Sequence, residues 1–76
     1  MDLLEEYADY LGCQYLSDLR YLKISPQQAR RIEMLPDSGH TLDEYNEAAR
    51  YILGASAPYS SIREARQAII EGLMRR

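Results

Sequence analysis

The chain contains the stretches Ser25-Pro26-Gln27-Gln28, Thr41-Leu42-Asp43-Glu44 and Ser61-Ile62-Arg63-Glu64, each a Ser or Thr followed three residues later by Gln or Glu. This spacing is typical of a capping box. The hydroxyl oxygen accepts a hydrogen bond from the N–H three residues on, and the Gln or Glu side chain accepts one from the first N–H. Two backbone donors without a partner inside the helix are thereby satisfied. The three stretches therefore predict three helix starts.

The residues around these starts extend the pattern to the whole chain. Apolar residues recur at spacings of three and four after each start, and no segment shows the alternation of a strand. A first helix is expected from Asp2 to about Leu11, with Gly12 just past its end. A short segment of about eight residues follows, with Tyr15, Leu16, Leu19 and Leu22 as its apolar stripe. The expected fold is all-α: a compact orthogonal or irregular bundle of four to five short helices in one domain, 1–76.

Helix ends are marked as clearly as helix starts. Pro36 ends the helix that Ser25 begins, and Gly54 closes the helix that Thr41 begins. The segments 37–40 and 55–60 have the composition of a turn and a linker. The last helix is expected to run from Ser61 to about residue 74.

The composition limits where the protein acts. The chain has 76 residues, 46% of them hydrophobic, and its longest apolar run, Tyr51-Ile52-Leu53, is far shorter than the roughly 20 residues of a membrane span. Residues 1–6 are acidic where a secretory signal is basic and then apolar. The sequence therefore predicts a cytoplasmic protein that does not enter a membrane.

The chemistry-bearing residues are few. Cys13 is the only cysteine, which excludes an internal disulfide and a thiolate-rich metal site, and we expect it to be a packing residue. His40 is the only histidine. It stands one residue before the Thr41 cap, where it can pack on Tyr45 as a hydrophobic staple. Phosphate loops and nucleophile elbows are missing from the sequence. We therefore expect no enzyme, no cofactor and no metal.

Tyrosine is the unusual residue of the composition, with seven copies and no Phe or Trp. A Tyr ring suits a protein interface, and it equally suits the edge of a small core, where its hydroxyl reaches water. We expect Tyr7, Tyr15 and Tyr45 in the core, because they lie on apolar stripes. Tyr51 and Tyr59 fit the stripes least and are the predicted interface residues.

The acidic side of the first helix is a second candidate contact surface. Glu5, Glu6 and Asp9 lie opposite its apolar stripe and would dock a basic partner. Together with the tyrosines, they predict a small intracellular, non-catalytic protein-interaction module, or a regulator or inhibitor of a larger protein. The partner is another protein or a second copy of this chain.

An alternative function is nucleic-acid binding by a helix-turn-helix over residues 16–35. Gln and Arg are the residue types that read base edges. The predicted recognition helix carries Gln27, Gln28, Arg30 and Arg31. The net charge of −3 and the absence of Gly from the turn count against this alternative, because DNA-binding domains present a basic face.

Overall fold

The computed structural model of the chain describes residues 2–36, 39–54 and 58–76. Within these ranges the elements are α1 (Leu3–Tyr10), a 3₁₀ helix η1 (Leu16–Arg20), α2 (Pro26–Glu33), α3 (Leu42–Leu53) and α4 (Ile62–Arg75). The described residues contain no strand, and the predicted all-α bundle is confirmed. Among these residues no helix is both long and apolar enough to cross a bilayer.

Two of the three predicted capping boxes are complete. Ser25 Oγ accepts from the Gln28 N–H at 3.2 Å, and Gln28 Oε1 accepts from the Ser25 N–H at 2.9 Å. Thr41 and Glu44 make the same reciprocal pair, both bonds at 3.2 Å. These boxes fix the first residues of α2 and α3.

The third predicted box forms only in part. Ser61 Oγ accepts from the Glu64 N–H at 3.1 Å, as expected. The Glu64 carboxylate, however, accepts from the N–H and the hydroxyl of Ser60, at 3.2 and 3.0 Å. Ser60 offers its N–H and its hydroxyl to the same carboxylate oxygen, so the carboxylate binds one residue further back than predicted. The cap of α4 is therefore shared between two serines.

The second predicted helix is shorter than expected, and its stripe is partly wrong. Only Leu16–Arg20 is helical, as a 3₁₀ helix, with Leu19 fully buried and Leu22 half-buried. Tyr15 was expected in the core but is exposed. Tyr15 precedes η1 in an extended conformation (φ −126°, ψ 149°). The spacing of four residues between Tyr15 and Leu19 would place them on one face only if both were helical, so Tyr15 does not share the buried face of Leu19.

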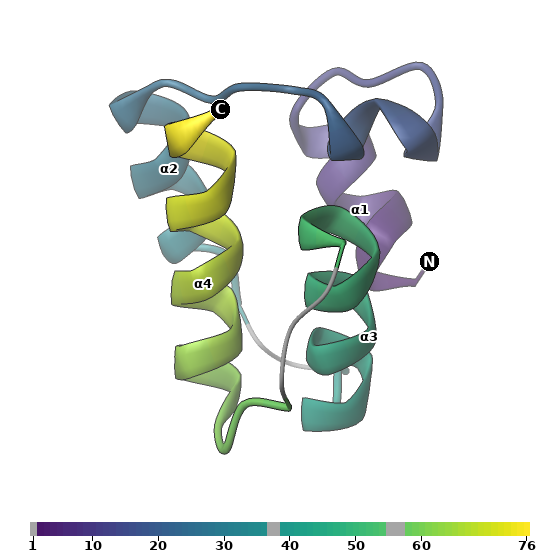
Figure 1. Cartoon of the computed structure of the whole chain (residues 1–76), viewed down its shortest axis with the longest axis vertical. Helices are drawn as coiled ribbons and strands as arrows, with labels where there is room; N and C mark the ends of the chain where they lie inside the picture. The colour runs from purple at the N-terminus through teal and green to yellow at the C-terminus, as the bar shows by residue number, and fades with distance from the viewer. Residues whose placement is uncertain (1, 37–38, 55–57) are drawn as a thin grey trace.

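The arrangement of the helices is irregular rather than up-and-down (Figure 1). Helices α3 and α4 run side by side in the same direction. At their beginnings Arg66 donates to Tyr45 Oη at 3.4 Å, and at their ends Arg76 donates to the carbonyl oxygen of Ile52. Helix α2 packs on α4, whereas α1 and η1 pack on α3 and on each other.

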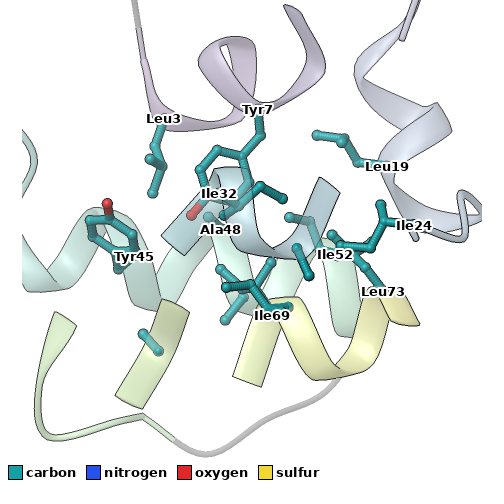
Figure 2. Close-up of a cluster of buried hydrophobic side chains, with 14 of the residues drawn as sticks. Leu3, Tyr7, Leu19, Ile24, Ile32, Tyr45, Ala48, Ile52, Ile69 and Leu73 are labelled. Carbon is teal, nitrogen blue, oxygen red and sulfur yellow. The ribbon is translucent and has the colours of Figure 1, made fainter. Parts of the chain in front are cut away.

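One core joins all five elements (Figure 2). Its largest fully buried side chains are Tyr7, Tyr45, Leu19, Ile32, Ile52, Ile69, Ile70 and Leu73. The extended segment between η1 and α2 is attached to the same core, because Ile24 is buried and its N–H donates to the carbonyl oxygen of Leu73 at 3.1 Å. One backbone carbonyl group in the last turn of α4 thus accepts its hydrogen bond from another segment of the chain.

Glycines perform two distinct tasks in this fold. Gly12 and Gly54 follow α1 and α3 with φ of 74° and 92°, the left-handed region predicted for a residue past a helix end. Gly72 lies within α4, where a Cβ would collide with the side chain of Leu53. It therefore allows the ends of α3 and α4 to approach closely.

Candidate functional site

The segment around η1 presents large apolar side chains to solvent. Their exposed fractions are 43% for Tyr10, 64% for Tyr15, 38% for Leu16 and 77% for Tyr21. We refer to these four residues as the η1 surface. The sequence placed Tyr10 and Tyr21 between core and interface and predicted none of the four as a site residue. Their proximity along the chain was the available signal, but Tyr15 and Leu16 were assigned to an apolar stripe.

The η1 surface rests on a firmly attached backbone. Leu19, within η1, is fully buried. The guanidinium of Arg76 donates to the carbonyl oxygens of Leu19 and Leu22, the latter at 3.1 Å, and to that of Ile52 at the end of α3. A side chain of α4's C-cap therefore ties η1 to α3, and the exposed rings are carried on an ordered platform.

The two predicted interface tyrosines lie apart from one another. Tyr51 is half-buried on α3, and the Arg20 guanidinium stands 5.6 Å from its ring centre, so it borders η1. Tyr59 is half-buried in the connection before α4, where its backbone bonds to Asn46. Asn46 belongs to the first half of α3, whereas η1 adjoins the end of α3 through Arg76.

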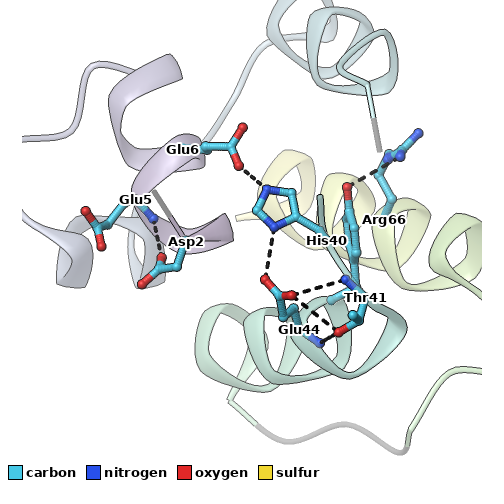
Figure 3. Close-up of polar contacts among 8 residues, drawn as sticks. Asp2, Glu5, Glu6, His40, Thr41, Glu44 and Arg66 are labelled. Atoms are coloured by element: carbon cyan, nitrogen blue, oxygen red, sulfur yellow. Dashed lines mark hydrogen bonds and ion pairs between the residues drawn. The ribbon is translucent and has the colours of Figure 1, made fainter. Parts of the chain in front are cut away.

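The three residues of the predicted acidic face, Glu5, Glu6 and Asp9, have different surroundings. Glu5 and Asp9 are exposed, and no described hydrogen bond uses their carboxylates. Glu6 instead points toward the beginning of α3 and contacts His40 (Figure 3). Glu6 is thus paired with His40 while 42% of its side chain stays exposed, and the predicted role of the three acids in binding a partner stays a prediction.

His40 lies between two carboxylates. Its Nδ1 is 3.0 Å from Glu44 Oε2, its Nε2 contacts Glu6 Oε2, and only 7% of its side chain is exposed. The hydrogen bonds to the carboxylates of Glu44 and then Glu6 raise the pKa of His40, and the bond with His40 lowers the pKa of Glu44. The predicted staple is also present, since the His40 and Tyr45 rings meet edge to face with centres 6.3 Å apart.

Two buried phenols lie behind His40. Burial raises the pKa of Tyr7 and of Tyr45 to about 12, so both hydroxyls keep their protons at neutral pH. The Arg66 guanidinium lies 5.7 Å from the centre of the Tyr45 ring. The cluster thus joins side chains of α1, α3 and α4 at one end of the bundle.

The segment proposed for nucleic-acid binding does not form a helix-turn-helix unit. In the described part of the chain η1 packs on α1 and α3, α2 packs on α4, and η1 and α2 do not contact each other. The expected corner is wrong because the connection after Leu22 runs on without a helical turn and carries α2 across to α4. Gln27, Arg30 and Arg31 are exposed, whereas Gln28 is engaged in the capping box of α2.

The remaining candidate groups offer little chemistry. No three His, Cys, Asp or Glu side chains of the described residues are placed to hold a metal ion. Cys13 is half-buried, and burial followed by the charge of Asp18 raises the pKa of its thiol. A hollow between α1 and α3 has a volume of about 120 Å³, below the roughly 300–1,000 Å³ of small-molecule sites. A larger hollow of about 350 Å³ is lined by Glu33, Arg63, Arg66 and Gln67 and reaches the lower end of that range.

No protein-family model matches the chain, and comparisons with curated proteins and with solved structures find no match either.

Proposed function

We propose that this chain is a small, non-catalytic protein-interaction module that binds another protein through the η1 surface. One observation carries the proposal. Tyr10, Tyr15, Leu16 and Tyr21 are exposed within twelve consecutive residues, next to the fully buried Leu19 that anchors their segment. Such a module would act as a regulator or inhibitor of a larger protein.

The physical case rests on what a tyrosine gains at an interface. Each ring brings about 150–250 Å² of surface that can be buried, and its hydroxyl can bond at the edge of the contact. Tyr has few rotatable bonds, so little side-chain freedom is lost on binding. Because Arg76 already holds the backbone of η1, the loop-ordering cost of association is reduced as well.

The surroundings of the η1 surface favour an apolar contact with a mixed polar rim. Asp9 and Asp18 are exposed near it, and so are Arg20 and Lys23. Two acidic and two basic residues are present here, so the rim favours a partner with charges of both signs rather than one strongly charged partner. Tyr51 extends the proposed contact toward α3 through its stacking with Arg20.

The test compares two double variants of the immobilised chain in lysate of its source cells. Tyr15→Ser with Tyr21→Ser alters the η1 surface, and Arg30→Glu with Arg31→Glu alters exposed residues of α2. We expect proteins that the wild type retains to be retained by the arginine variant and lost by the tyrosine variant. Circular dichroism checks that both variants remain folded.

A second copy of the chain is tested separately by sedimentation equilibrium of the purified protein. If the chain binds itself through the η1 surface, the wild type dimerises with rising concentration and the tyrosine variant stays monomeric. Retention of every partner by the tyrosine variant would contradict the proposal. Partners lost only in the arginine variant would favour nucleic acid or an acidic protein bound to α2 instead.

A further inference from the structure

The contacts of His40 connect two helices that are distant in sequence. Glu6 belongs to α1 and lies 34 residues before His40, whereas Glu44 belongs to α3. Among the described elements α1 packs only on η1 and α3. The Glu6–His40–Glu44 contacts therefore attach α1 to the beginning of α3 through polar groups (Figure 3).

The geometry of the ring dictates its protonation state. An ionised carboxylate only accepts hydrogen bonds, and a neutral imidazole has only one N–H to donate. Both ring nitrogens of His40 contact carboxylate oxygens. The two contacts are therefore satisfied together when the ring is an imidazolium that donates from Nδ1 and Nε2.

The groups around His40 make its imidazole ring the group of this cluster that gains or loses a proton near neutral pH. The titratable and charged side chains around it are Glu6 and Tyr7 of α1, Glu44 and Tyr45 of α3, and Arg66 of α4. Both phenols are neutral near neutral pH, because burial raises their pKa values to about 12. The bond with His40 lowers the pKa of Glu44, so this carboxylate stays charged there.

We propose that Glu6, His40 and Glu44 form a proton-dependent latch that holds α1 on α3 and releases α1 when the imidazolium loses a proton. Once the ring is neutral, one nitrogen presents a lone pair to a carboxylate oxygen, and that contact becomes repulsive. Only 7% of the His40 side chain is exposed, so the ring nitrogen that loses its proton has little access to water. Release exposes Leu3, Tyr7 and Ala8, the buried residues of α1.

The direction of the effect follows from linkage. The folded-state pKa of His40 is raised, so its stabilising contribution is complete below about pH 6.5, the ordinary histidine value, and is lost as pH rises through the folded-state pKa. The pKa of Glu44 is lowered, so its contribution is present above its ordinary value and is lost in acid. The latch is therefore strongest in mildly acidic solution.

The first experiment measures the pKa of His40 by proton NMR, which is direct because the chain has a single histidine. The variant Glu6→Gln removes the charge that contacts the ring. Glu5→Gln is the matched control, since it removes the same charge from the next, exposed position of α1. We expect a wild-type pKa above the ordinary value, lowered by Glu6→Gln and little changed by Glu5→Gln. Equal pKa values in the two variants would overturn the proposal.

The second experiment follows the release of α1 itself by amide hydrogen exchange, corrected for the intrinsic pH dependence of exchange. Between about pH 6 and about pH 8.5, where histidine loses its proton, we expect protection in α1 to fall several-fold more than protection in α3 and α4. In His40→Gln the protection of α1 should be low at both pH values, whereas Glu5→Gln should behave as the wild type. A parallel fall in all helices, or no fall in α1, would overturn the latch.

Discussion

Asn46 binds the backbone of Tyr59 through both of its side-chain amide atoms: Oδ1 accepts from the Tyr59 N–H at 2.8 Å, and Nδ2 donates to the Tyr59 carbonyl oxygen at 3.3 Å. Tyr59 lies in the connection that precedes α4, whereas Asn46 belongs to the first half of α3. The Asn46 side chain therefore holds Tyr59 beside that half of α3.

Asn46→Ala should therefore lower the free energy of unfolding by about 1–3 kcal/mol, since two part-buried polar groups of Tyr59 lose their partner. Glu47→Ala is the matched control, because Glu47 is the next residue of α3 and is exposed. We expect its effect to stay within about 0.5 kcal/mol. Urea denaturation followed by circular dichroism measures both, and equal midpoints would contradict the role assigned to Asn46.

The last two arginines of the chain should differ sharply in their contribution to stability. Arg76 donates to three backbone carbonyl groups of η1, its flank and α3, whereas the side chain of Arg75 is 81% exposed. Arg76→Ala should cost about 1–3 kcal/mol, because charged donors make the stronger hydrogen bonds. Arg75→Ala should cost less than about 0.5 kcal/mol. Thermal unfolding of the two variants distinguishes them, and equal melting temperatures would show that Arg76 does not hold η1.

The helix caps provide a graded test. Thr41→Ala and Ser61→Ala should each destabilise the protein by about 0.5–2 kcal/mol. We expect Thr41→Ala to cost more, because its box with Glu44 is reciprocal, whereas the Glu64 carboxylate keeps its two bonds to Ser60 when Ser61 is changed. Melting temperatures of the two variants check the order. A larger loss in Ser61→Ala would contradict it.

Features decided within one turn of chain were predictable from the sequence. The boxes at Ser25 and Thr41, and the left-handed glycines after α1 and α3, depend on residues at most four positions apart. The partner of the Glu64 carboxylate was missed by one residue, because two neighbouring serines compete for it. Local chemistry thus predicts where α2, α3 and α4 begin and where α1 and α3 end, but not the bounds of η1.

Features decided by the packing of distant segments were not predictable in this way. Glu6 was assigned to a solvated face because its spacing places it opposite the apolar stripe, but α3 brings His40 against it from 34 residues away. Tyr15 was assigned to the core on a spacing that holds only inside a helix, and it lies outside η1. Helices α3 and α4 run in the same direction, and the capping residues of neither helix predict this arrangement.

The thiol of Cys13 should be slow to react in the folded protein. Burial and the nearby carboxylate of Asp18 raise its pKa, so less of the reactive thiolate is present at a given pH. We expect a disulfide reagent to modify the native protein several-fold more slowly than the urea-unfolded protein at the same pH. A native rate equal to or above the unfolded rate would show a reactive cysteine.

Binding to duplex DNA should be negligible near physiological salt, about 150 mM, because affinity for phosphate depends on a field of basic residues. The chain has a net charge of −3. The exposed Arg30 and Arg31 belong to α2, which packs on α4, whereas η1 packs on α1 and α3. Fluorescence anisotropy of a labelled random duplex, measured in low and in physiological salt, checks this. Any weak binding in low salt should disappear with added salt and in Arg30→Glu with Arg31→Glu, while Tyr15→Ser with Tyr21→Ser leaves it unchanged. Micromolar binding that survives physiological salt and is lost in the arginine variant would contradict the expectation and restore α2 as a nucleic-acid-binding helix.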